Sequence, residues 1–271
     1  MRSFEGRLAV VTGAGSGIGR ATALALAKRG CNLVVQDVRA ERVEAVAEEV
    51  RQLGVTVHTA CFDVAQPDGH RALAERCQSE WGGAHLLVNN AGVSLTVDFE
   101  ESSLEDWEWV VGVNLWGVVY GCHAFLPQLR AQPEAHIVNI SSIFGAIGVP
   151  TQSAYCATKF AVRGLTESLH VELQDTAVGI TCVHPGAVAT RIVSDSRFKA
   201  NPEQPHLRRR AEKMIGAGIS PEQAAREIVA AIANNRPRLV LGRDGRFMDV
   251  LSRLMPVGYR WFVRRQRQRL G

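Results

Sequence analysis

Short apolar runs alternate along the chain with longer stretches in which apolar residues recur every three or four positions. The short runs are typical of buried strands, and the longer stretches are typical of amphipathic helices. The predicted strands cover residues 8–12, 32–36, 55–61, 84–89, 136–141, 179–183 and 238–241. The predicted helices cover residues 17–29, 40–52, 68–81, 104–130, 152–174 and 221–234.

This alternation predicts an α/β fold. Strands separated by helices of ten or more residues form βαβ units, and strands that are apolar throughout belong to a parallel sheet covered on both faces. Right-handed crossovers then give a doubly wound sheet of about seven strands, the Rossmann arrangement. We expect a single domain over residues 1–242, followed by a basic helical extension over residues 243–271.

Composition agrees with a globular, intracellular protein. The chain has 271 residues, of which 46% are hydrophobic and 21% charged, so global disorder is excluded. No run approaches the length of a membrane-spanning apolar helix, and the N-terminal segment does not read as a secretion signal. The six cysteines form no CxxC pair, which favours reduced thiols. We therefore expect a cytoplasmic location.

Positive charge gathers at the end of the sequence. The net charge is +4, but residues 243–271 hold eight Arg and two Asp. The other 242 residues are therefore slightly acidic, with a net charge of −2. No nucleic-acid partner is expected, because such partners need a basic surface on the main domain.

A glycine-rich turn follows the first predicted strand and opens the first predicted helix. Glycines let the backbone turn tightly and approach a phosphate, and a helix N-terminus presents free N–H groups to an anion. The GxxxGxG spacing at this place predicts a site for the pyrophosphate of a dinucleotide, with a tight turn that binds nothing as the alternative. The residues expected to contact the cofactor here are Gly13, Gly15, Ser16, Gly17, Ile18 and Gly19.

Polar and small residues also end the next three predicted strands. Asp37 can accept hydrogen bonds from an adenosine ribose and would repel a 2′-phosphate, which makes NAD the expected cofactor and NADP the less favoured one. A helix N-cap is the alternative for Asp37. Further cofactor contacts are expected after the third and fourth predicted strands, at Asp63, Val64, Asn90, Ala91 and Gly92.

Tyr155 and Lys159 are four residues apart on a predicted helix, so both project from one face. A nearby ammonium stabilises a phenolate and lowers the pKa of the tyrosine, which suits proton exchange with an alcohol or carbonyl oxygen. Ser142 follows a predicted strand and can hydrogen-bond the same substrate oxygen. A tyrosine and lysine at this spacing are by themselves an ordinary solvated pair, so the other motifs carry the inference.

Together these residues resemble the classical short-chain dehydrogenase/reductase family over about residues 6–241. The matching features are Thr12–Gly19, Asp63, Asn89-Asn90-Ala91-Gly92, Asn114, Ser142, Tyr155-Cys156-Ala157-Thr158-Lys159 and His184-Pro185-Gly186 followed by Thr190. The resemblance implies that Tyr155 is the acid/base and that Ser142 orients the substrate oxygen. It also implies that Lys159 holds the nicotinamide ribose and that Asn114 supports a water of a proton relay in a locally distorted helix.

The same resemblance extends to the cofactor and to assembly. It implies that Pro185, Gly186, Val188 and Thr190 meet the nicotinamide amide. It also implies a homodimer or homotetramer that pairs through the long helices carrying Asn114 and Tyr155.

The expected chemistry is reversible hydride transfer between a small-molecule secondary alcohol and NAD, without a metal ion. Residues 187–218 are expected to form a substrate lid, and Ser142, Phe144 and Tyr155 to contact an apolar substrate. Two alternative functions remain open. The first is a membrane-associated reductase of lipid or steroid-like ketones, which has the same chemistry and a different partner. The second is a regulator that binds a dinucleotide without catalysis.

The extension beyond residue 242 has its own pattern. Apolar residues from Phe247 to Met255 follow helical spacing, and Pro256 and Gly258 interrupt it before an aromatic, arginine-rich segment. Three interpretations are open. The extension docks on a neighbouring subunit, lies as a peripheral element on an anionic membrane surface, or is a solvated end.

Overall fold

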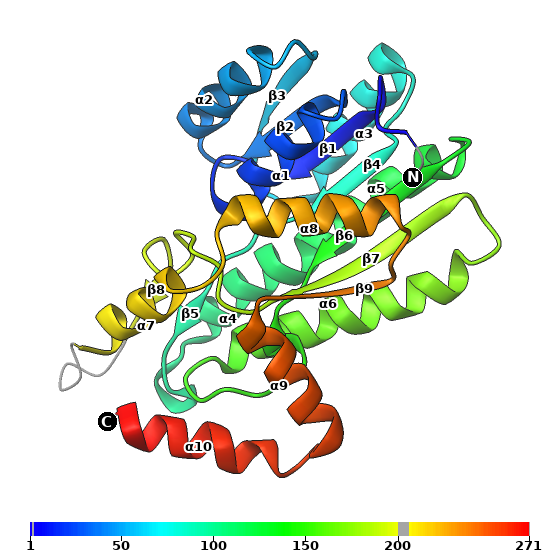
Figure 1. Cartoon of the computed structure of the whole chain (residues 1–271). Helices are drawn as coiled ribbons and strands as arrows, with labels where there is room; N and C mark the ends of the chain where they lie inside the picture. Colours follow the sequence, from blue (N-terminus) through cyan, green and yellow to red (C-terminus); the bar gives the residue numbers. More distant parts are fainter. Residues whose placement is uncertain (2, 200–205, 271) are drawn as a thin grey trace.

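Seven parallel strands form the central sheet of the computed structural model, which describes residues 1, 3–199 and 206–270 (Figure 1). Their order across the sheet is β3-β2-β1-β4-β6-β7-β9, which confirms the predicted doubly wound fold. The strand order reverses between β1 and β4, where ligands bind in such sheets. The strands are β1 (Leu8–Thr12), β2 (Asn32–Asp37), β3 (Val57–Cys61), β4 (Leu86–Asn89), β6 (Ala135–Ile140), β7 (Val178–Pro185) and β9 (Arg238–Leu241).

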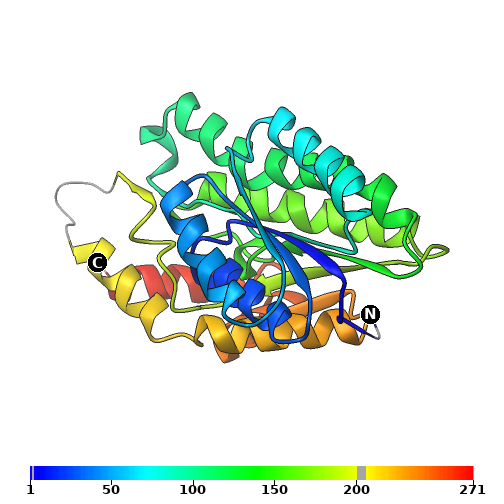
Figure 2. The same cartoon turned by 90° about the horizontal axis from the view of Figure 1, so that it is seen from above.

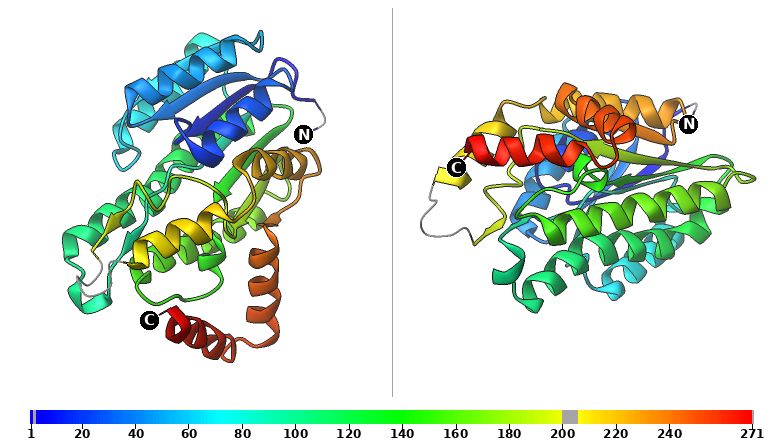
Figure 3. Two further views of the ribbon diagram at one scale, coloured as in Figure 1. Left: turned by 60° about the vertical axis from the view of Figure 1, so that its left-hand side comes forward. Right: turned by 90° about the horizontal axis from the view of Figure 1, so that it is seen from below.

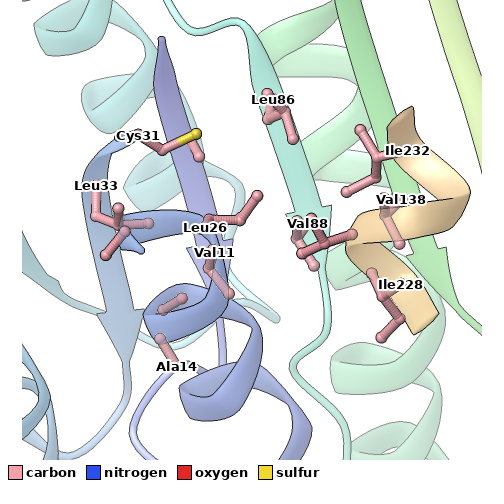
Figure 4. Packing of buried hydrophobic residues seen from close by; sticks show 14 of the residues in the cluster. Val11, Ala14, Leu26, Cys31, Leu33, Leu86, Val88, Val138, Ile228 and Ile232 are labelled. Atoms are coloured by element: carbon pink, nitrogen blue, oxygen red, sulfur yellow. The ribbon is translucent and has the colours of Figure 1, made fainter. Parts of the chain in front are cut away.

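Helices cover both faces of this sheet (Figure 2). One face carries α1 (Gly17–Ala27), α2 (Ala40–Arg51) and α8 (Pro221–Ala233), and the other carries α3 (Pro67–Trp81), α5 (Gly117–Arg130) and α6 (Ser153–Glu172). Neighbouring residues of a strand point to opposite faces, so Val11 belongs to the same apolar layer as Leu26 and Ile228 (Figure 4), whereas Val10 belongs to the opposite layer with Phe125. Both apolar layers are therefore buried from water.

The helical stretch predicted over residues 104–130 is continuous but not regular. It consists of α4 (Leu104–Val111), a turn of π-helix over Gly112–Trp116 and α5. By length and apolar composition, this is the one described helix that could cross a membrane. Its inner residues, among them Val118 and Phe125, pack in the core of the sheet, as those of a core helix do.

Additional structure fills the region between β7 and α8. Two short strands pair there, β5 (Leu95–Thr96) with β8 (Arg197–Phe198), and α7 (His206–Gly216) follows. Lys199 forms an ion pair of 2.6 Å with Asp106 of α4, and Arg42 of α2 forms one of 2.9 Å with Asp195. The described parts of the predicted lid are thus tied to both faces of the domain, while residues 200–205 of that lid lie outside the described residues.

Two helices form the C-terminal extension, α9 (Arg243–Leu254) and α10 (Tyr259–Leu270). Figure 3 shows them as an angled arm that leaves β9 and returns beneath the start of α6. Pro256 and Gly258 lie between the two helices, as the sequence predicted. The Tyr259 hydroxyl accepts a hydrogen bond of 3.0 Å from the backbone of Gly148, so the arm is fixed to its own domain.

Candidate active site

The glycine-rich turn lies between β1 and α1 and has the shape that an anion site requires. Gly13 and Gly17 adopt positive φ angles of 60° and 54°, which side chains disfavour. The first turn of α1 receives no hydrogen bond from the N-cap side chain of Ser16 and holds no acidic residue. Its backbone N–H groups therefore remain available to an anion.

The turn after β4 is held directly against the glycine-rich turn. The side-chain amide of Asn90 donates to the carbonyl oxygens of Thr12 and Gly13 at 2.9 and 3.0 Å. In return, the Thr12 hydroxyl accepts from the backbone N–H groups of Asn90 and Ala91. A Cβ atom on Gly13 would come within 2.7 Å of the Cα atom of Ala91, so only glycine allows this approach.

Asp37 contacts the same turn from β2. One of its carboxylate oxygens accepts from Gly15 N at 3.1 Å, and the other accepts from Arg39 N at 3.2 Å. Asp63 is exposed just beyond β3, where its carboxylate accepts from the backbone of Ala65, and the neighbouring Val64 is buried. Because the strands are parallel, all these predicted adenosine contacts lie at the carboxyl ends of the strands, on the same side of the sheet.

The segment after β7 reaches the glycine-rich turn from the other side. Pro185 ends β7, and Gly186 donates a backbone hydrogen bond to Leu241 of β9. Val188 is buried and forms a parallel bridge with Ile219. A Cβ atom on Gly17 would lie 3.1 Å from the methyl carbon of Thr190. The residues predicted to meet the nicotinamide therefore adjoin those predicted to meet the pyrophosphate.

The four predicted catalytic residues are all buried around Gly92 and the start of α6. The Asn114 oxygen and the Lys159 ammonium nitrogen lie 3.3 and 3.4 Å from the position that a Cβ atom on Gly92 would take. That nitrogen is 5.6 Å from the centre of the Tyr155 ring, and the Ser142 side chain lies near the Tyr155 hydroxyl. The structure brings these four residues together from three places in the chain: the π-helix, the turn after β6, and α6.

Neighbouring groups fix these side chains in place. Asn114 lies within the π-helix, which agrees with the locally distorted helix implied by the resemblance, and its side chain forms two hydrogen bonds with the backbone of Val93. His184 hydrogen-bonds the carbonyl oxygen of Ser142 at 3.1 Å. The Phe144 ring packs edge-to-face on Tyr155, with 6.1 Å between ring centres, so the predicted substrate contact adjoins the phenol.

Burial disfavours the charged form of both titratable groups. It raises the pKa of Tyr155 to about 12, although the nearby Ser142 side chain favours the phenolate, and it lowers the pKa of Lys159 to about 8. The Lys159 ammonium alone predicts a lowered tyrosine pKa, and the enclosure of the ring reverses that direction. The lysine ammonium also donates to the carbonyl oxygen of Ile140, at 3.0 Å.

Sequence reasoning gave no role to three residues that shape this site. Thr12 links the two turns, Gln36 accepts a hydrogen bond from the backbone of Gly13, and Thr158 accepts one from Asn114 and donates to the carbonyl oxygen of Tyr155. Thr12 and Thr158 lie inside the recognised motifs, so the sequence could have marked both as residues of the site. No motif marks Gln36, which is buried within β2.

Comparison with known proteins finds one family over most of the chain. The family model described as short chain dehydrogenase matches residues 7–201. SadH of Mycobacterium tuberculosis, described as an oxidoreductase, is 40% identical over 265 residues, which is 97% of this chain and 96% of that protein. The similarity thus includes the arm as well as the sheet.

Two further relatives carry more specific descriptions. Cyclohexanol dehydrogenase of Acinetobacter sp. strain SE19 is 39% identical over 193 residues, which is 71% of this chain and 77% of that enzyme. A short chain dehydrogenase/reductase from Burkholderia phymatum, solved in complex with NAD, is 35% identical. It superimposes with a TM-score of 0.83 over 89% of this chain and 90% of its own.

Proposed function

This chain belongs to the short-chain dehydrogenase family, and on that premise we propose that it interconverts a hydrophobic secondary alcohol and its ketone with NAD. The observation that carries the proposal is the buried group of Ser142, Tyr155 and Lys159 beside Gly92. Membership of the family makes the protein an oxidoreductase. The cofactor preference, the substrate class and the residue roles are the proposal.

The residues present fit a dinucleotide. The uncapped start of α1 would hold the pyrophosphate, and the close approach of Gly13 to Ala91 keeps side chains out of that place. Asp37 would accept hydrogen bonds from the adenosine ribose, which favours NAD over NADP. When bound, the nicotinamide supplies or accepts the hydride.

The protein's own groups manage the proton. At neutral pH, a Tyr155 pKa of about 12 keeps the phenol protonated, so it can donate to the oxygen of a ketone as that oxygen gains charge. The Ser142 hydroxyl hydrogen-bonds the same oxygen and orients it. A Lys159 pKa of about 8 leaves the ammonium charged at pH 7, where it stabilises the phenolate that remains.

Apolar side chains around this group support a hydrophobic substrate. Phe144 packs on Tyr155, and the buried Leu95 and Ile147 belong to the segments that follow β4 and β6. The relative described as cyclohexanol dehydrogenase supports a compact apolar alcohol as the first substrate to test.

The test is a Tyr155→Phe variant assayed with cyclohexanol and a panel of other apolar alcohols and ketones. We expect the variant to bind NADH as the unaltered protein does, and to lose at least about 100-fold in kcat, because general acid/base catalysis contributes that much. Turnover that persists in the variant would remove the role of Tyr155. NADH binding without turnover of any compound by the unaltered protein would favour a dinucleotide-binding regulator.

Assembly and location complete the proposal. We propose a cytoplasmic homodimer or homotetramer that pairs through α5 and α6, and the exposed apolar side chains of Trp116, just before α5, and Phe160, on α6, support this pairing. Sedimentation of the Phe160→Asp variant checks this, because a buried carboxylate would dissociate the pair.

The arm supports peripheral contact with an anionic membrane surface. Its outer surface holds a dense group of exposed apolar side chains, and residues 250–271 include six Arg and no acidic residue. Aromatic, arginine-rich helices with an apolar face bind such surfaces. The exposed apolar residues are Phe247, Val250, Leu254, Met255, Val257 and Trp261.

Vesicle sedimentation tests this contact. We expect the chain to bind phosphatidylglycerol vesicles and not phosphatidylcholine vesicles, and a chain ending at Leu241 to bind neither. Leu254→Asn should weaken binding, whereas Leu104→Asn, at an equally exposed leucine of α4, should leave it unchanged. Equal binding by the truncated chain would exclude the arm as the contact.

A further inference from the structure

A cavity of about 660 Å³ lies between the arm and the segment that leads into α6. Ligand pockets in proteins have volumes of about 300–1,000 Å³, so this space can hold a small molecule. In Figure 3, α10 passes beneath the segment that leads into α6. The domain contributes Gly148, Val149, Pro150, Ser153 and Cys156 to its wall, and the arm contributes Arg260, Val263 and Arg264.

The helical period of α10 places the cavity-lining residues on one face, where Val263 is half-buried and Arg260 and Arg264 also reach solvent. Arg260, Val263 and Arg264 follow i, i+3, i+4 spacing and share the inner face. Trp261 belongs to the outer face, where it is 63% exposed and the guanidinium of Arg265 lies 5.2 Å from its ring centre. The cavity residues are therefore distinct from the proposed membrane contact.

Among the described residues, no carboxylate neutralises the two arginines at the cavity. In α9, Arg253 forms an ion pair with Asp249, and Arg246 forms one with Glu227. Within residues 1, 3–199 and 206–270, by contrast, no ion pair joins a carboxylate to Arg260 or Arg264. Arg260 and Arg264, one helical turn apart, thus line a space whose other walls are largely apolar.

We propose that this cavity binds an amphipathic acid, with the anionic group on Arg260 and Arg264 and the apolar chain along Val149, Pro150 and Val263. Guanidinium groups bind carboxylates through paired, charge-assisted hydrogen bonds, and the apolar wall removes the chain from water. Cys156, at the cavity, directly follows Tyr155 in α6, so the acid lies on the outer side of the segment that carries the candidate catalytic phenol. The proposal does not depend on the redox function.

Calorimetric titration of the full chain with decanoate, without cofactor, tests the proposal. Decanol is the matched neutral ligand. We expect decanoate to bind, and decanol to bind at least about tenfold more weakly, because hydrogen bonds to a charged group are the stronger ones. Arg260→Gln and Arg264→Gln should each weaken decanoate binding by about tenfold and leave decanol binding unchanged.

Three controls make the test specific. Arg265→Gln, on the outer face of the same helix, should bind decanoate as the unaltered chain does, and so should Tyr155→Phe. Val263→Trp should weaken binding by narrowing the cavity, and circular dichroism shows whether this variant is folded. Equal affinity for decanol and decanoate, an equal loss in Arg265→Gln, or no decanoate binding by the unaltered chain would each overturn the proposal.

Discussion

The buried imidazole of His136 predicts that the protein loses stability in mild acid. His136 lies in β6, is 1% exposed, and its Nε2–H donates to the Thr181 hydroxyl at 2.8 Å, because that hydroxyl itself donates to the carbonyl oxygen of Arg236. Its other ring nitrogen is packed against Gly179. A proton added there would place a positive charge on a buried ring, which burial disfavours.

The magnitude follows from the pKa of this group. Burial lowers the pKa of His136 to about 3, and the nearby N-terminal ammonium lowers it further, whereas the unfolded chain has a value of about 6.5. As the pH falls below 6.5, the unfolded chain takes up a proton that the folded chain does not. Between pH 7 and pH 5 this residue therefore lowers the free energy of unfolding by about 2 kcal/mol.

Urea unfolding at pH 7 and pH 5 measures this loss. Other buried histidines add to it, since burial also lowers the pKa of His184, to about 4. A His136→Gln variant isolates the one residue, because glutamine keeps a donor for Thr181 and does not titrate. We expect the stability difference between the two pH values to shrink by about 2 kcal/mol in this variant.

The control is His170→Gln, at an exposed position of α6, which should leave the pH dependence as it is. If His136→Gln loses as much stability between pH 7 and pH 5 as the unaltered protein, His136 is not the group that takes up the proton, and the reasoning from its burial is refuted.

Three further predictions concern the turn, the cofactor and the lid. Gly19→Ala would place a methyl against the carbonyl oxygen of Gly13 and should cost about 1–3 kcal/mol in urea unfolding, whereas Gly164→Ala, in open space on α6, should add up to about 1 kcal/mol. Asp37→Ser should raise NADPH affinity relative to NADH affinity by about tenfold in fluorescence titration. Asp106→Asn removes the charge that two lid cations pair with, and should raise KM by up to about fivefold without changing NADH affinity.

The sheet and the turns at its edge could be predicted because short-range pattern determines them. Apolar runs such as residues 8–12 and the helical spacing between them are local, and right-handed crossovers leave few arrangements. Glycines at positions 13 and 17 mark backbone shapes that other residues disfavour. The π-helix left no such signal, because Gly112–Trp116 has the periodicity of the α-helices on both sides.

Properties that depend on contacts between distant parts of the chain could not be predicted from local sequence patterns. The pairing of β5 with β8 joins two-residue strands about a hundred positions apart, too short for any periodic pattern. The pKa of Tyr155 depends on how completely its ring is covered, which reverses the direction expected from Lys159 alone. Burial depends on the assembled core. The motif therefore identifies the catalytic residues but does not predict their pKa values.

For the arm too, the sequence predicted the helix but not what its surface contacts. Helical spacing predicted that residues 247–255 form an amphipathic helix, and three occupants of its apolar side remained open. In the structure that side stays largely exposed, with Leu254 78% accessible, while the arm is attached through Tyr259 and the loop at Gly148. That contact joins residues 111 positions apart. It places Arg260 and Arg264 at the cavity beside α6, so the proposed acid site and the proposed membrane contact lie on different sides of one basic helix.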